Sequence, residues 1–271
     1  MPVSSKGNLC FVAAFPVAAL LLFVSLVGIL TPGIYAGETA NWQAQAIGQD
    51  WADLLLGVPW LTTTGVLATR GSRRSSFLLA AGLLYTFYEF VIYAFELHFN
   101  ALFLPYCALL GVCFFALATI GVHYLRTDVG GWFSPTAKVR MAGATLLVVA
   151  LSFALIWLAE ILPALLSGGT PPSVTTAGTP TNPVYVLDLS IVLPAHLLAG
   201  ASLLRRRTLG FVLAPILLGF DVLMGLSLTA MLWIMQQRGL QADQSVAFAM
   251  FGLAVVCALM LLRLLSGLRG S

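Results

Sequence analysis

The chain has 271 residues, of which 60% are hydrophobic and 8% are charged, and its formal net charge is +3. Soluble domains carry about 25% charged residues, so this composition excludes a soluble globular protein. About 20 apolar residues cross a bilayer core of about 30 Å, and eight runs of the chain are long enough. Because backbone groups in lipid must be hydrogen-bonded internally, we predict an all-α polytopic transmembrane helical bundle. The predicted spans are 11–31, 51–69, 75–95, 101–125, 141–166, 185–204, 209–235 and 245–265.

The first predicted span follows Lys6 and has the position of a signal peptide. The apolar core of a signal peptide has about 7–15 residues, and this run is longer, so we expect an uncleaved first helix. Small residues around Ala36 leave cleavage open as an alternative.

The basic residues fall at alternate ends of the predicted spans, and only Arg238 falls on the opposite side. The positive-inside rule therefore predicts that both termini are cytoplasmic. The net charge follows from this topology and does not indicate a nucleic-acid partner, although the basic loops suit anionic lipid headgroups. The alternating set is Lys6, Arg70, Arg73, Arg74, Arg126, Lys138, Arg140, Arg205, Arg206, Arg207, Arg263 and Arg269.

The second and sixth spans align without gaps, which predicts a parallel 4+4 repeat of residues 1–135 and 136–271. An even number of helices per half places the pseudo-twofold axis along the membrane normal. Chance is the alternative, since arginine and glycine matches are common. The aligned pairs are Asp53 with Asp188, Pro59 with Pro194, Gly65 with Gly200 and Arg70 with Arg205. Glu89 and Asp221 occupy similar places in the spans that follow. Pro32 and Pro163 are expected to end spans one and five.

Two long segments are predicted as outer loops. Residues 32–50 are polar, and residues 167–184 are rich in Gly, Pro, Thr and Ser. The second has the composition of a flexible crossing. Neither is long enough to form a domain of its own.

Five acidic residues lie within or at the ends of the predicted spans: Asp53, Glu89, Glu160, Asp188 and Asp221. Counted from the cytoplasmic arginines, Asp53 and Asp188 lie at about 25 Å depth, Glu89 and Asp221 at about 21–23 Å, and Glu160 at about 30 Å. No Lys or Arg lies at that depth. Charges inside a membrane are costly and usually face a bundle interior or water.

We therefore predict an acidic, aromatic pocket that opens to the outer face. Tyr85, Glu89 and Tyr93 fall on one helical stripe at four-residue spacing, and this stripe is expected to face the pocket. The predicted pocket residues are Asp53, Tyr85, Glu89, Tyr93, Glu160, Asp188 and Asp221, and the predicted rim residues are Gln49, Asp50, Glu96, His98, Asn100 and Asn182.

Structural explanations compete with this prediction. Asp53 and Asp188 would also be favourable if each opened a helix, at the positive end of the helix dipole. Glu160 would fit at the outer interface, Tyr93 in an interfacial aromatic belt, and Asp221 in a hydrogen bond between helices.

Other chemistry finds little support. The three histidines (His98, His123 and His196) fall at different depths, so a zinc site is not expected, and His196 is interpreted as a polar packing residue. The four cysteines (Cys10, Cys107, Cys113 and Cys257) form no C-x-x-C pair and are interpreted as small apolar residues. No catalytic motif places a nucleophile beside a base, so we predict no catalytic residue, metal or cofactor.

Several short segments give a resemblance to a family of uncharacterised bacterial multi-pass membrane proteins. They are Gly48-Gln49-Asp50, Tyr93-Ala94-Phe95, the run from Phe99 to Leu104, and Asn182-Pro183 followed by Asp188. The resemblance covers most of the chain and implies a bacterial inner-membrane setting. It implies no activity and no catalytic residue.

The favoured function is therefore a small membrane binding or transport protein. Its partners would be the lipid bilayer and a proton, a metal cation or a cationic or amphiphilic small molecule. An enzyme acting on a lipid or isoprenoid, with Glu89 or Asp221 as acid or base, is the first alternative. An accessory subunit whose polar residues only join helices is the second.

Overall fold

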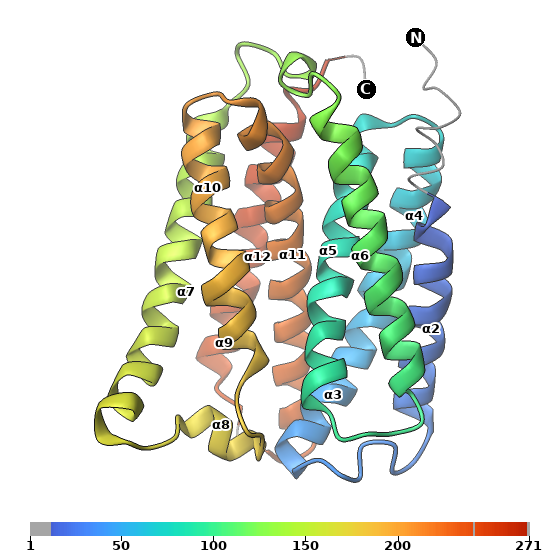
Figure 1. The fold of residues 1–271 in the computed structure, drawn as a ribbon, viewed down its shortest axis with the longest axis vertical. Coiled ribbons are helices and arrows are strands. Elements are labelled where there is room, and N and C mark those ends of the chain that lie inside the picture. The colour runs from blue at the N-terminus through green and yellow to red at the C-terminus, as the bar shows by residue number, and fades with distance from the viewer. Residues whose placement is uncertain (1–11, 241, 270–271) are drawn as a thin grey trace.

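The computed structural model describes residues 12–240 and 242–269, so Lys6 and Cys10 lie outside it. It is a bundle of long helices that run side by side along the longest axis (Figure 1). The α-helices are α2 (Ala14–Leu30), α3 (Ala40–Ala52), α4 (Val58–Thr69), α5 (Arg73–Glu96), α6 (Phe103–Leu125), α7 (Val139–Ser167), α8 (Pro172–Ala177), α9 (Pro183–Leu187), α10 (Leu193–Leu204), α11 (Thr208–Gln237) and α12 (Gln244–Leu265). The π-helical segments are η1 (Asp53–Gly57) and η3 (Asp188–Val192), and η2 (Gly130–Trp132) is a 3-10 turn.

Six helices within the described residues are long and apolar enough to cross a membrane, which confirms the helical membrane class. They are α5, α6, α7, the continuous helix Pro183–Leu204, α11 and α12. The helix α2 is equally apolar but shorter, with 17 residues. The segments α3, η1 and α4 follow one another without a break from Ala40 to Thr69.

Two helices form the centre of the bundle. Most of the surface of α5 and α11 is buried, whereas α6, α7 and α12 expose most of theirs. The central helix α11 contacts α3, α5, α10 and α12. Polar groups in the middle of α5 and α11, such as Glu89 and Asp221, are therefore buried within the bundle.

The loops that carry most of the basic residues meet at one end of the bundle, the upper end in Figure 1, where α2 begins and α12 ends. There the Arg73 guanidinium donates to the Arg269 carbonyl oxygen at 3.1 Å and lies 4.8 Å from the ring centre of Trp132. Arg206 donates to the Ala137 carbonyl oxygen at 3.1 Å. The loops between α4 and α5, α6 and α7, and α10 and α11 thus form one basic surface together with the end of α12.

The segment 32–50 is not a loop throughout, because α3 begins at Ala40. The Thr39 side chain caps this helix by accepting a hydrogen bond from the Trp42 backbone N–H at 3.3 Å. The polar α3 packs closely on α11: a Cβ atom at Gly48 would lie 2.7 Å from the Met231 Cα. Tertiary packing therefore extends the continuous helix Ala40–Thr69 beyond its apolar part.

Two further expectations, at the end of the bundle opposite the basic surface, were wrong. Pro163 does not end the fifth helix, since α7 continues to Ser167 and ends at Gly168, whose φ of 68° is left-handed. Segment 167–184 contains the short helix α8 and the start of α9, which is capped by a hydrogen bond from the Val184 N–H to the Asn182 side chain. A proline within a membrane helix is tolerated where neighbouring groups compensate for its missing N–H.

The two π-helical segments stand at matching places. Each begins at an aspartate and ends two residues before a proline: Asp53 and Pro59 in one half, Asp188 and Pro194 in the other. In each, a backbone N–H reaches back five residues to the aspartate carbonyl, from Val58 and from Leu193. A wider turn spares the clash that a proline ring makes with the carbonyl four residues earlier.

Candidate functional site: two buried polar clusters

Three carboxyl groups lie together inside the first half of the bundle, and we call Asp50, Asp53 and Glu89 the acid cluster. Asp50 is on α3, Asp53 opens η1 and Glu89 is on the central helix α5. Their side chains are 1%, 1% and 4% exposed, so the cluster is closed to solvent in this conformation. Among the described residues no Lys or Arg forms an ion pair with them; the two ion pairs found there both involve histidine.

The Asp53 and Glu89 carboxyl groups lie close enough to interact electrostatically, but Asp53 Oδ2 and both Glu89 oxygens have no hydrogen-bond partner among the described residues. Two ionised carboxylates offer only acceptors, so such a contact requires a proton on one of them. If both were ionised, Asp53 Oδ2 and both Glu89 oxygens would be buried without a donor among the described residues. One shared proton supplies a donor between Asp53 Oδ2 and one of the two Glu89 oxygens.

The remaining Asp53 oxygen is held by neutral donors. Tyr85 Oη donates to Asp53 Oδ1 at 2.8 Å, and Gln49 Nε2 lies 3.3 Å from the same oxygen and 2.6 Å from Tyr85 Oη. Ser227 of α11 donates to Gln49 Oε1 at 2.5 Å. Gln49 therefore joins three helices and orients the hydroxyl and amide donors that face Asp53.

Asp50 has a separate environment. Its Oδ2 accepts a hydrogen bond of 2.8 Å from Tyr35 Oη, while Oδ1 is buried without a partner among the described residues. Tyr93 Oη donates to the Ala46 backbone oxygen at 3.0 Å, one turn earlier on α3. Gln49 and Asp50, expected at an outer rim, are thus buried within the helix bundle.

A second buried cluster lies in the second half, and we call Asp188, His196 and Asp221 the histidine cluster. His196 Nε2 lies 2.9 Å from Asp221 Oδ1, and His196 Nδ1 lies 2.8 Å from the Val192 carbonyl oxygen. Asp188 accepts hydrogen bonds from Tyr88 Oη at 3.0 Å and from Trp157 Nε1 at 2.7 Å. The histidine is 1% exposed, and the aspartates 8% and 6%.

Sequence reasoning missed the role of His196 because helix rise alone places it about 8 Å nearer the cytoplasmic end than Asp221. The two helices are antiparallel neighbours, and side chains lean toward the N-terminus of their own helix. The His196 side chain therefore points along α10 away from the basic end of the bundle, and the Asp221 side chain points along α11 toward that end. The two side chains meet in a hydrogen bond. The sequence feature that could have indicated this pair is an acid and a histidine on consecutive, antiparallel helices.

Glu89 and Asp221 both face the bundle interior, as expected, but they belong to different clusters. Phe220 and Leu223 form a buried apolar group together with the rings of Tyr85 and Tyr88. Tyr85 donates to Asp53 and Tyr88 to Asp188, so this apolar group adjoins both clusters. The contacts of Glu89 are with the acid cluster, and those of Asp221 are with His196 and Cys257.

Asp53 and Asp188 do not open helices, so the helix-dipole explanation for them was wrong. Thr39 caps the continuous helix Ala40–Thr69, and Asn182 caps the continuous helix Pro183–Leu204. Each aspartate instead opens the π turn within its helix. The wider turn and not a helix end presents these carboxyl groups to the interior.

The remaining predicted residues lie outside both clusters. Glu160 is partly exposed and accepts a hydrogen bond of 2.8 Å from the Ser173 N–H at the start of α8. The His98 N–H and imidazole both bond to Glu38, at 2.7 and 3.0 Å. Asn100 accepts from the Leu102 N–H at 2.9 Å, and Glu96 is partly exposed at the end of α5. These residues order the outer loops.

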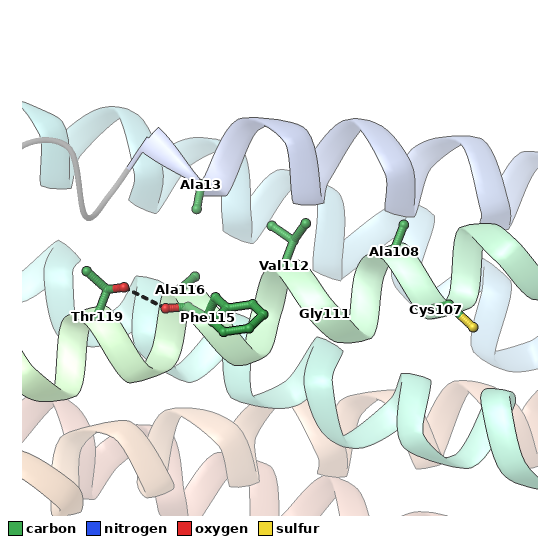
Figure 2. Close-up of a pocket in the computed structure, with 8 residues that line it drawn as sticks. All are labelled: Ala13, Cys107, Ala108, Gly111, Val112, Phe115, Ala116 and Thr119. Atoms are coloured by element: carbon green, nitrogen blue, oxygen red, sulfur yellow. Dashed lines mark hydrogen bonds between the residues drawn. The ribbon is translucent and has the colours of Figure 1, made fainter.

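Two grooves lie on the surface of the bundle, and neither is lined by the acid or histidine cluster. Figure 2 shows the groove between α2 and α6, of about 470 Å³, along which Ala13, Ala108 and Gly111 lie. The other, of about 510 Å³, lies between α11 and α12 beside η1 and has Asp243 at its polar end. Both are mainly apolar, in contrast to the clusters.

Comparison with known protein families, with curated proteins and with solved structures finds no match. The function is therefore argued from the geometry of the two clusters.

Proposed function

We propose that the protein is an integral membrane binding or transport protein whose acid cluster binds a proton between Asp53 and Glu89. The observation that carries this proposal is the contact between two buried carboxyl groups without a basic partner among the described residues. Buried charges in membrane helices are costly and mark ion or proton sites. One proton removes a negative charge and provides the hydrogen bond that the pair lacks.

A proton suits this site better than a larger cation. Calcium binds about six to eight oxygen ligands, and magnesium binds about six in octahedral geometry. Among the described residues, no group of three or more His, Cys, Asp or Glu side chains has an arrangement suited to a metal. An organic cation needs an accessible cavity, whereas Asp53 and Glu89 are buried.

We further propose eight membrane spans, with α2 and the continuous helix Ala40–Thr69 added to the six longer apolar helices. Because the basic loops share one end, the positive-inside rule favours cytoplasmic termini. The matched π turns before Pro59 and Pro194 support the parallel 4+4 repeat. The setting in a bacterial inner membrane rests on the resemblance described from the sequence.

Cysteine labelling tests this topology. In a background with Cys10 and Cys107 changed to Ser, we expect a cysteine at Thr175 to react with an impermeant maleimide from outside intact cells. A cysteine at Thr136, which is also exposed, should react only after the cells are opened. The background protein without an added cysteine is the control, and the opposite labelling pattern would reverse the orientation.

Infrared spectroscopy tests the shared proton. At neutral pH, the protein in bilayers should show the C=O stretch of a protonated carboxylic acid, shifted in D₂O. Glu89→Gln should remove this band, because an amide keeps the shape and some hydrogen bonding of Glu but cannot titrate. A pH-dependent loss of the band in the wild type would give the range over which the proton leaves.

Glu160→Gln is the matched control, since it removes a carboxyl group that is bonded to a backbone N–H outside both clusters. It should leave the band of the acid cluster unchanged. If the wild-type spectrum has no such band, or if Glu89→Gln removes none of its intensity, the proton site at Asp53 and Glu89 is refuted. The accessory-subunit interpretation, in which the cluster only joins helices, would then be favoured.

A further inference from the structure

We infer that the second half of the bundle holds a second proton site, formed by His196 and Asp221. This site goes beyond the one proposed between Asp53 and Glu89, because different residues form it. It pairs an imidazole with a carboxyl group, whereas the first site pairs two carboxyl groups. Two hydrogen bonds of His196 together require one hydrogen more than a neutral imidazole carries.

The first hydrogen bond fixes one proton on the imidazole ring. His196 Nδ1 lies 2.8 Å from the Val192 carbonyl oxygen, one turn earlier on the same helix. A carbonyl oxygen has no hydrogen to donate, so Nδ1 must carry one. In a neutral ring, the other nitrogen, Nε2, would then be an acceptor.

The second hydrogen bond requires a second proton. His196 Nε2 lies 2.9 Å from Asp221 Oδ1, and an ionised carboxylate is also only an acceptor. Two acceptors at this distance repel unless a hydrogen lies between them. The pair therefore holds one proton more than a neutral imidazole and an ionised carboxylate together.

The surrounding groups favour this proton on the histidine. Asp188 has a neutral donor on each oxygen, from Tyr88 of α5 and Trp157 of α7, which suits an ionised carboxylate. Asp188 and Asp221 both lie close enough to His196 to interact with it electrostatically. Cys257 of α12 lies 3.7 Å from Asp221 Oδ2 as a weak donor. Among the described residues, the acids facing His196 are therefore Asp221 and Asp188.

The alignment of the two halves explains why their chemistry differs. With Asp53 matched to Asp188, the residue at the place of His196 is Leu61, which is fully buried and apolar. Glu89 and Asp221 occupy similar but not aligned places, since this register matches Asp221 to Thr86, and the glutamate is longer by one methylene group. The longer acid contacts Asp53 directly, whereas the shorter acid contacts the imidazole.

Nitrogen NMR of ¹⁵N-histidine protein in bilayers tests this inference. We expect both ring nitrogens of His196 to be protonated at neutral pH, with ¹³C-aspartate labelling showing Asp221 ionised. His196→Gln identifies the signals among those of His98 and His123. In Asp221→Asn, His196 should become neutral with its hydrogen on Nδ1, while Asp243→Asn, at the exposed cap of α12, should change nothing.

Sequential assignment of the uniformly labelled wild-type protein identifies the His196 and Asp221 signals independently, so the test holds even if a variant does not fold. A neutral His196 beside an ionised Asp221 would overturn the second site. A neutral His196 beside a protonated Asp221 carboxyl group would retain the site with its proton on the acid. The infrared test follows the band intensity that Glu89→Gln removes, and the NMR test follows His196. Failure of one proton site is therefore distinguishable from failure of the other.

Discussion

Gly28→Ala is expected to destabilise the protein by about 4 kcal/mol, combining overpacking with the loss of a buried hydrogen bond. A Cβ atom at Gly28 would lie 2.0 Å from Asp50 Oδ2 and 2.6 Å from Tyr35 Oη. These two atoms form the 2.8 Å hydrogen bond that satisfies one Asp50 oxygen, Oδ2, within the bundle. The free energy of unfolding in mixed detergent micelles, titrated with a denaturing detergent, would measure the effect.

Gly111→Ala is the matched control, because it lies on a membrane helix and a Cβ atom there meets nothing within 4 Å. It should be neutral or stabilise by about 0.5–1 kcal/mol through helix propensity. Adding Asp50→Ala to Gly28→Ala removes the clash, so the double variant should be more stable than the sum of the two single effects. Simple additivity would show that Gly28 does not act through Asp50.

Gln49→Leu is expected to cost about 3 kcal/mol, because it leaves several buried polar partners unsatisfied at once. The Gln49 amide donates toward Asp53 and Tyr85 and accepts from Ser227. A leucine can do neither, so α3 would lose its side-chain hydrogen bonds to Tyr85 of α5 and Ser227 of α11. The same unfolding titration measures the loss.

The control for Gln49 is Gln45, one turn earlier on α3 and only partly buried. Its side chain makes one hydrogen bond of 2.6 Å, to Asn41 on the same helix. Gln45→Leu should therefore change the stability by less than about 1 kcal/mol. If the two variants were equally stable, Gln49 would not be the residue that joins these helices.

The membrane class and the interior position of Glu89 and Asp221 were predictable, because apolar run length and the cost of buried charge are local properties of the sequence. The helical state of residues 40–52 was not. Its residues are polar, and they are helical because Thr39 caps them and Gly48 permits close contact with α11. Such contacts depend on which helices become neighbours.

The composition of the clusters was predictable only in part. Asp53, Tyr85 and Glu89 were expected together and are in contact. The pairing of His196 with Asp221 was not expected, since counting helix rise ignores the opposite lean of side chains on antiparallel helices. Ser227 and Trp157 carry no sequence signal, because one hydroxyl or indole on an apolar helix is ordinary.

The π turns at Asp53 and Asp188 bear on how the chain arose. A π turn is an α-helix with one additional residue, so everything on its outer side is rotated by about 100° relative to the inner side. Under the proposed duplication, the simplest history places that one-residue insertion in the ancestral four-helix unit, since both copies carry it before the same proline. The exchange that left Leu61 in one copy and His196 in the other then followed the duplication. In that order of events, one ancestral acid pair gave rise to two sites of different proton chemistry.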